Sequence, residues 1–168
     1  MYDELTQVDL DKMRAEIEYR TNTLRPKLIE DVKTARAFGD LSENFEYKAA
    51  KREKNRNDSR IRYLERMVKT ARLICPQAGD GETVALFDKL TIYMEEDGEE
   101  REIRLVTTLR QNALEGLISK ESPVGRALLG HRVGERVLVE VSPDYSYYVQ
   151  IRALEKGGDD PNLEISRY

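Results

Sequence analysis

The sequence predicts an α+β protein with an N-terminal antiparallel coiled-coil helical hairpin over residues 1–76, followed by a small α+β domain over residues 80–156. Three observations predict this division. Apolar residues recur at an average spacing of about 3.5 from Leu10 to Phe38, which is the seam of a coiled coil. The same period returns, less purely, in the basic stretch that follows. After the breaker cluster at residues 76–81 the pattern changes to short alternating runs, which are typical of β-strands.

Each arm of the hairpin is predicted from its own seam. The seam positions of the first arm are Leu10, Met13, Ile17, Leu24, Leu28, Val32, Ala35 and Phe38, and Thr21 occupies the seam position between Ile17 and Leu24. The second arm places there Ala50, Asn57, Ile61, Leu64, Val68 and Ala71. Pro26 predicts a kink or a restart in the first arm, because proline cannot continue the helical hydrogen bonds. Residues 38–44 are too few for anything but a tight turn, so the two arms must run antiparallel.

The second domain is expected to contain five short strands and one short helix. The expected strands are residues 83–87, 89–94, 102–107, 137–141 and 147–154. Asp97-Gly98 predicts a hairpin turn. Ser122-Pro123 predicts the start of a helix over residues 124–129, with the serine as its N-cap. The glycine-rich and acidic segment at residues 157–168 predicts a mobile tail.

The composition restricts the classes of protein. Charged residues make up 36% of the 168 residues and apolar residues 39%, which suits a thin architecture better than one large core. No apolar run has the length of a membrane span or signal peptide, so a cytoplasmic protein without a membrane partner is expected. The lone Cys75, which is predicted to pack at a helix end, excludes an internal disulfide and cannot form a zinc site with the lone His131. The net charge of −4 hides a basic segment at residues 46–75, where 10 basic and 4 acidic side chains give +6 and indicate a polyanionic partner.

Asp40 and Glu43 form an acidic pair in the predicted turn of the hairpin. The structural interpretation is a capping box, with aspartate at the N-cap of the second helix and glutamate three residues later. Carboxylates also interact favourably with the positive end of a helix. A capping box does not explain why two carboxylates lie at the exposed end of a long rod, nor why few other acids surround them.

Several stretches of the chain resemble the signatures of one family. Residues 37–51, AFGDLSENFEYKAAK, look like the tip signature of the bacterial Gre transcript cleavage factors, and residues 25–29, RPKLI, match the first helix of these factors. Residues 122–130, SPVGRALLG, are similar to the second signature of the family, and Val133-Gly134-Glu135 follows as the family would have it. The resemblance covers roughly residues 10–141, in family order and with family spacing. It implies that the second domain is FKBP-like and docks on RNA polymerase.

The resemblance also implies a function for the acidic tip. In this family the hairpin enters the secondary channel of RNA polymerase and promotes cleavage of the 3′ segment of backtracked RNA. Asp40 and Glu43 match the carboxylates that handle metal in the family, and they would secure a second Mg²⁺ beside the one that the polymerase holds. Because Mg²⁺ takes about six oxygen ligands, two carboxylates bind it only weakly. The chain is therefore expected to be an accessory factor and not an enzyme by itself. It is also expected to be a monomer.

Charge and the resemblance together predict the remaining site residues. Contacts with the backbone of the extruded RNA are expected from Lys51, Arg52 and Arg56. A solvated flank of a coiled coil would have the same composition, and that alternative stays open. Contacts with the polymerase are expected from Ser122 and Pro123. Tyr47 could stack on a base or pack against Phe38.

The sequence departs from the family pattern at three places. Phe45 stands where the family usually has a small residue, residues 142–145 replace a Gly-Gly turn, and the chain runs past the usual end. Two alternatives to a cleavage factor are a Gre-like inhibitor in the same channel and a polymerase-binding regulator without a catalytic contribution. The intact Asp-x-x-Glu pair argues against the inhibitor. A prolyl isomerase or chaperone is a weaker alternative, because a fold does not imply a function and the chain has only three Phe and no Trp to line a proline pocket.

Overall fold

The computed structural model describes residues 3–39, 44–76 and 81–166. The chain divides into two compact units. One unit comprises Leu10–Ala71, and the other combines Asp3–Asp9 with the chain from Arg72 onward. The sequence had placed all of residues 1–76 in the hairpin domain, so the structure differs in assigning the first strand and the first helical turn to the second unit.

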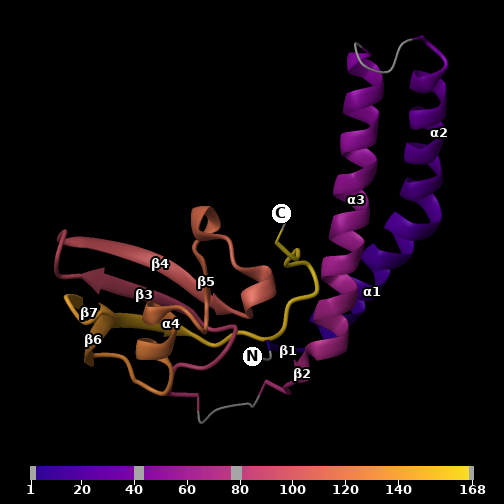
Figure 1. The fold of residues 1–168 in the computed structure, drawn as a ribbon. Helices are drawn as coiled ribbons and strands as arrows, with labels where there is room; N and C mark the ends of the chain where they lie inside the picture. Colours follow the sequence, from indigo (N-terminus) through magenta and orange to yellow (C-terminus); the bar gives the residue numbers. More distant parts are fainter. Residues whose placement is uncertain (1–2, 40–43, 77–80, 167–168) are drawn as a thin grey trace. The chain divides into compact units, whose positions relative to one another are not determined.

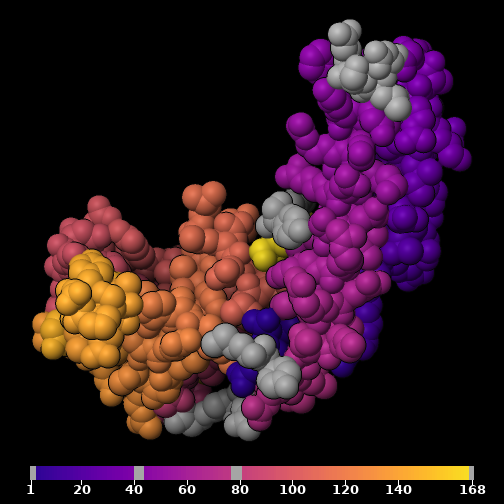
Figure 2. Space-filling model, in the orientation of Figure 1, coloured from indigo at the N-terminus to yellow at the C-terminus, as the bar shows by residue number. Residues whose placement is uncertain are grey.

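The first unit is a hairpin of helices (Figure 1). Its first arm contains α1 (Gln7–Tyr19), a π-helical turn η1 (Arg20–Leu24) and α2 (Arg25–Arg36), and its second arm is the single helix α3 (Phe45–Thr70). Helices α2 and α3 lie side by side (Figure 1). In the space-filling view the magenta atoms of α3 lie directly against the indigo atoms of the first arm (Figure 2). The predicted helical hairpin is confirmed.

The hairpin buries only a narrow apolar seam. Its buried apolar residues are Leu10, Met13, Ala35, Ile61 and Leu64. Other predicted seam positions, such as Ile17 and Val32, are half-buried. This is the thin architecture that the composition indicated. Within the described part of the chain, no helix combines the length and the apolar character that a membrane crossing needs.

Polar groups cross the seam where the first arm changes from α1 to α2. In the π-helical turn the Arg25 N–H donates to the Arg20 carbonyl, five residues back. Asn57 of α3 is 3% exposed, and its Nδ2 donates to the same carbonyl at 3.2 Å while its Oδ1 accepts from Arg20 Nη1 at 3.0 Å. The kink or restart predicted at Pro26 is therefore a π-helical turn. Pro26 itself occupies the first turn of α2, where no intrahelical donor is required.

Glu16 completes this polar crossing. Its Oε1 accepts from Arg20 Nε at 2.8 Å and, across the seam, from Arg60 Nε at 2.9 Å. Burial raises the pKa of Glu16, but the hydrogen bonds from Arg60 and Arg20 outweigh burial and leave the pKa below its ordinary value of 4.5. Ionic and amide hydrogen bonds therefore join the two arms in addition to the apolar contacts.

The second unit is built on a five-stranded sheet of order β5-β4-β3-β7-β6 (Figure 1). Its strands are β3 (Lys89–Met94), β4 (Glu99–Val106), β5 (Leu117–Ser119), β6 (Arg136–Ser142) and β7 (Tyr145–Glu155). Neighbouring strands are antiparallel except β4 and β5, which are parallel. Helix α4 (Pro123–Leu128) packs on the face that carries the main core: Leu90, Ile92, Ile103, Leu105, Leu128, Val137, Val139, Val149 and Ile151. The predicted α+β class is confirmed.

The strand predicted at residues 83–87 is wrong. Thr83 makes an isolated bridge to Arg132, and the chain then turns so that Phe87 has a φ of +71°. This left-handed conformation is unfavourable for a residue with a Cβ and cannot continue a strand. Phe87 is fully buried against Val106 and Leu117, so its packing offsets the backbone strain.

Three short strands were not predicted from the sequence, and one side chain that was predicted to pack is exposed. β1 (Glu4–Leu5) pairs in parallel with β2 (Arg72–Leu73), and the three-residue β5 extends the sheet beside β4. Runs of two or three residues are too short to show a period of two. Cys75, which was predicted to pack, is exposed.

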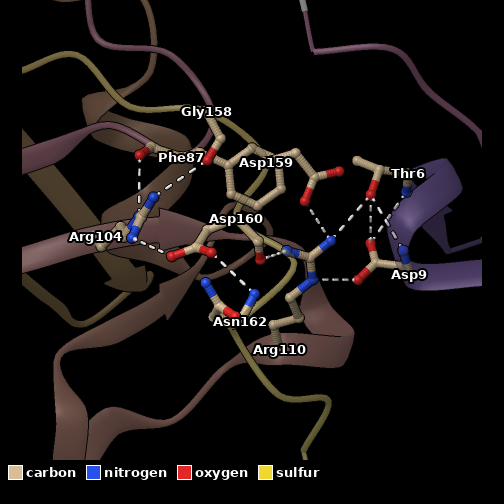
Figure 3. Close-up of polar contacts among 9 residues, drawn as sticks. All are labelled: Thr6, Asp9, Phe87, Arg104, Arg110, Gly158, Asp159, Asp160 and Asn162. Carbon is tan, nitrogen blue, oxygen red and sulfur yellow. Dashed lines mark hydrogen bonds and ion pairs between the residues drawn. The ribbon is translucent and has the colours of Figure 1, made fainter. Parts of the chain in front are cut away.

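A buried arginine joins separate segments of the second unit (Figure 3). Arg110 ends the 3₁₀ turn η2 (Thr108–Arg110), and its side chain is fully buried. Its Nε donates to Asp9 Oδ1 at 2.5 Å, and its Nη2 donates to Thr6 Oγ1 at 3.1 Å. The guanidinium carbon lies 5.1 Å from the centre of the Phe87 ring. Arg110 therefore binds the N-terminal segment to the sheet domain, together with the ion pair between Lys120 and Glu4.

The C-terminal segment meets the same arginine. Arg110 Nη1 donates to the Asp160 carbonyl at 3.1 Å, and the Asp159 carboxylate lies 2.5 Å from Arg110 Nη2. The Asp160 carboxylate lies 3.9 Å from Arg104 Nη1. Residues 157–166, for which the sequence predicted a mobile tail, thus have defined partners in the structure, while their mobility stays a prediction.

Candidate nucleic-acid interface

Helix α3 begins with an asparagine cap. Asn44 Oδ1 accepts from the Tyr47 N–H at 3.0 Å, and Asn44 Nδ2 donates to the Ala35 carbonyl, near the end of α2, at 2.7 Å. One side chain thus satisfies an unpaired donor of α3 and an acceptor of α2. The capping box predicted for Asp40 and Glu43 is wrong, because the N-cap position belongs to Asn44. Asp40 and Glu43 themselves lie outside the described residues.

Tyr47 is held by cations from both arms. Arg36 Nη2 donates to the Tyr47 hydroxyl at 3.4 Å, and the Arg36 guanidinium carbon lies 5.5 Å from the ring centre. Lys51 Nζ lies 5.9 Å from the same centre. The hydrogen bond from Arg36 and the charges of both cations hold the pKa of the Tyr47 hydroxyl below its ordinary value of 10.0. These contacts favour packing over base stacking, with Arg36 as the packing partner instead of the predicted Phe38.

The three basic residues predicted to contact RNA fall on two sides of α3. At about 100° per residue, Arg52 and Arg56 project within about 20° of Phe45 along the helix. The side chains of Lys51, Arg52 and Arg56 are all exposed. Lys51 projects about a third of a turn away from Phe45, on the side of Tyr47. The structure therefore brings Arg52 and Arg56 together with Phe45 and separates Lys51 from them.

Other cations of α3 are neutralised within the hairpin. Lys54 Nζ of α3 lies 3.1 Å from the carboxylate of Asp58. The same carboxylate lies 2.9 Å from Arg25 Nε of α2. Arg60 is buried and paired with Glu16. The net charge of +6 for residues 46–75 therefore overstates the charge that is open to an anionic partner.

Ser122 and Pro123 open helix α4 as the sequence predicted. Ser122 Oγ accepts from the Gly125 N–H at 3.0 Å and donates to the Ser119 carbonyl at 2.7 Å, so its hydroxyl is used within the domain. A Cβ at Gly125 would lie 2.2 Å from the Ser119 carbonyl oxygen, which explains why this position is glycine. Pro123 is exposed at the first turn, so it is the member of the pair that is open to a partner.

The acidic pair fits a shared metal ion by its donor chemistry. The carboxylates of Asp40 and Glu43 are hard oxygen ligands of the kind that Mg²⁺ prefers, and they leave most of its coordination positions to water or to another molecule. Among the residues that the structure describes, no group of three or more His, Cys, Asp or Glu side chains could hold a metal ion. Because two carboxylates supply too few of the roughly six oxygens that Mg²⁺ takes, the pair by itself fits an ion that another molecule also binds.

Comparison with known proteins decides the family. Residues 4–73 match the family described as transcription elongation factor, N-terminal, and residues 79–156 match the C-terminal domain of GreA/GreB transcription elongation factors. The chain belongs to the GreA/GreB family. Transcription elongation factor GreA of Geobacillus kaustophilus is 38% identical over 90% of this chain and 95% of its own length. GreA of Thermoanaerobacter pseudethanolicus is 41% identical over 82% of this chain and 87% of its own length.

A solved structure is also similar to this GreA/GreB chain. GreA factor homolog 1 (Gfh1) of Thermus thermophilus is 25% identical and covers 93% of this chain and 100% of its own, with a TM-score of 0.42. The family matches confirm the resemblance that the tip and α4 signatures indicated, and the GreA/GreB chain is a transcription elongation factor.

Proposed function

We propose that this GreA/GreB chain binds RNA polymerase, places its hairpin tip in the secondary channel and stimulates the polymerase's own cleavage of backtracked RNA. Membership of the family supports RNA polymerase as the partner. That the chain acts in the cytoplasm and as a monomer is part of the proposal. The single observation that carries the cleavage function is the Asn44 cap, because the N-cap of α3 is Asn44 and not Asp40. Capping of α3 therefore does not account for the acidic pair, and metal binding is the role that we propose for it.

Asp40 and Glu43 would hold a second Mg²⁺ next to the ion of the polymerase. When bound, this second ion supplies activation of a water molecule and stabilisation of the leaving oxygen in phosphodiester hydrolysis. The contribution of the two side chains would be negative charge and hard oxygen ligands for the ion. Neither carboxylate needs to contact the RNA to do this.

The other proposed contacts divide between the two units. Lys51, Arg52 and Arg56 would contact RNA phosphates, which adds affinity without a choice of sequence. Pro123 and the first turn of α4 would meet the polymerase. In this proposal the hairpin contributes the chemistry and the sheet domain contributes docking.

The test is addition of the full chain to a stalled, backtracked polymerase complex with Mg²⁺. The proposal predicts shortened transcripts and released 3′ fragments, at a rate well above that of the complex alone. Slower elongation without shortened transcripts would identify an inhibitor instead. Binding with no effect on either rate would leave a regulator without catalytic contribution.

A further inference from the structure

Phe45 presents an aromatic ring to solvent at the first position of α3. Its side chain is 81% exposed, whereas the seam residue Ala35 of α2 is buried. The helix does not require the ring at this position, because Asn44 caps α3 and the seam is formed by other residues. A single exposed apolar side chain does not by itself mark a binding surface, so the groups around Phe45 decide what its ring can bind.

The surroundings of Phe45 are cationic. Lys48 Nζ lies 5.8 Å from the centre of the Phe45 ring, within the range of a cation–π interaction. Arg52 and Arg56 continue on the same side of α3, so the ring and the cations form a row about 16 Å long. The Arg56 side chain is 64% exposed, and its nearest described carboxylate, on the equally exposed Glu53, is 3.9 Å away. Such an exposed pair is weak and can exchange for a phosphate.

We propose that Phe45 is a stacking platform for an unpaired nucleobase of the extruded RNA, with Lys48, Arg52 and Arg56 holding the adjacent phosphates. This inference rests on the proposed function, because it requires single-stranded RNA beside α3. Proteins that bind single strands combine an aromatic face for bases with a positive track for the backbone. Tyr47 fits this role less well, because it is half-buried and has cations from both arms, Arg36 and Lys51, near its ring. Phe45 is 81% exposed.

An apolar pocket on the polymerase fits this surface less well. Insertion of Phe45 into such a pocket would carry Lys48 out of water along with the ring, and an unpaired charge in an apolar environment is unfavourable. A nucleobase stacks on the ring and brings its own phosphate to the lysine. The row of cations along α3 therefore favours RNA as the occupant.

The test places 2-aminopurine in the extruded 3′ segment of the transcript in a backtracked polymerase complex, without added Mg²⁺. Full-length wild type should change the 2-aminopurine fluorescence on binding, and so should Phe45→Tyr, which keeps the ring. Phe45→Leu should abolish the change and raise the half-saturating concentration for cleavage in Mg²⁺ about fivefold or more. With wild type, a purine at the stacked position should give a lower half-saturating concentration than a pyrimidine, and this difference should disappear in Phe45→Leu.

The matched control is Phe38→Leu, which removes a 70% exposed ring from the other arm. This variant should behave as wild type. The inference is overturned if Phe45→Leu gives the wild-type fluorescence change or if Phe38→Leu loses the change equally. It is also overturned if Phe45→Leu weakens binding to a complex without extruded RNA to the same extent, which would assign the ring to the polymerase surface. Absence of cleavage by wild type despite a fluorescence change would reject the proposed function and leave the stacking site in place.

Discussion

At the scale of single residues, Arg110 shows how one side chain can connect distant parts of the chain. Its guanidinium has five N–H donors in a fixed plane, and acceptors come from both the N-terminal and the C-terminal segments (Figure 3). Asp9, its partner in the first turn of α1, is also fully buried. A charge with this degree of burial depends on its partner, because water cannot reach it to replace the ion pair.

Arg110→Met should therefore destabilise the protein by about 3–5 kcal/mol, because it leaves Asp9 buried without its cation. The matched control is Arg101→Met, which removes an exposed arginine from an ion pair with Asp97 and should cost less than about 1 kcal/mol. Urea unfolding of both variants gives the two free energies. Equal destabilisation in the two variants would show that the Arg110 pair contributes no more than a surface pair.

Two capping motifs show what residue patterns can predict. Thr6 precedes α1, its N–H donates to Asp9 Oδ2 at 3.0 Å, and the Asp9 N–H donates to Thr6 Oγ1 at 3.4 Å. This is the reciprocal geometry of a capping box, and the Thr-x-x-Asp spacing in the sequence could have revealed it. At the second arm the sequence allowed a capping box at Asp40 and Glu43 beside metal binding, but the N-cap of α3 is Asn44. Asparagine is among the preferred N-cap residues, so its residue type was a signal for this role.

At the scale of elements, the polar crossing between the arms gives the hairpin a pH dependence. The folded pKa of Glu16 is below its ordinary value of 4.5, so the ionised carboxylate contributes stability that is present above that value. This stability is lost as the pH falls through the lowered folded pKa. Protonation removes the ionic character of its contacts with Arg20 and Arg60 and leaves the buried Arg60 with a weaker partner.

Glu16→Gln should reduce the acid sensitivity of the hairpin between about pH 5 and pH 2. The variant should be less stable than wild type at pH 7, and the difference should shrink as the pH falls. Helix content followed by circular dichroism at several pH values measures this. Glu30→Gln, at an exposed position of α2, is the control and should keep the wild-type acid profile. An unchanged acid profile in Glu16→Gln would contradict the assignment.

The basic side of α3 gives a salt-dependent prediction. Arg52→Ala with Arg56→Ala should lower the slope of log affinity for a backtracked complex against log salt by roughly 0.7 to 1 for each phosphate that the helix no longer binds. Lys27→Ala with Lys33→Ala removes the same charge from exposed positions of α2 and should leave the slope near that of wild type. Identical slopes in both double variants would assign Arg52 and Arg56 to a solvated helix flank.

Element length decided how much of the fold the sequence could predict. The two arms and strands β3, β4, β6 and β7 have several periods of pattern each, and all were predicted. Strands β1, β2 and β5 have two or three residues and depend on pairing with distant segments. The strand predicted at residues 83–87 failed because the burial of Phe87 outweighed its unfavourable backbone conformation, which alternation cannot show.

At the scale of the whole molecule, the chain does not divide at residue 76 into two independent halves. Asp3–Asp9 belongs to the second unit, through β1 and through Asp9. A fragment of residues 80–168 therefore lacks part of its own fold. The division between a docking domain and an active hairpin should be tested in the full chain.

The fragment of residues 80–168 should be less stable than the second unit of the full chain, because Arg110 is left without Asp9. In that fragment Arg110→Met should cost clearly less than the same change in the full chain. Comparing the two free-energy changes by urea unfolding gives the coupling between Arg110 and the N-terminal segment. Equal changes in fragment and full chain would show that the N-terminal segment is not coupled to Arg110.

The central claim is that the tip carboxylates, Asp40 and Glu43, bind metal for RNA cleavage. The most direct test measures the cleavage rate of backtracked complexes as a function of Mg²⁺ concentration, with wild type and with Asp40→Asn. The substitution leaves the Asn44 cap intact, so the unfolding free energy should change by less than about 1 kcal/mol. We expect the cleavage rate of Asp40→Asn to fall at least about tenfold and to recover in part at higher Mg²⁺ concentration. Binding of the variant to the polymerase should persist. Glu43→Gln should behave in the same way. Wild-type cleavage by Asp40→Asn at every Mg²⁺ concentration would contradict the claim.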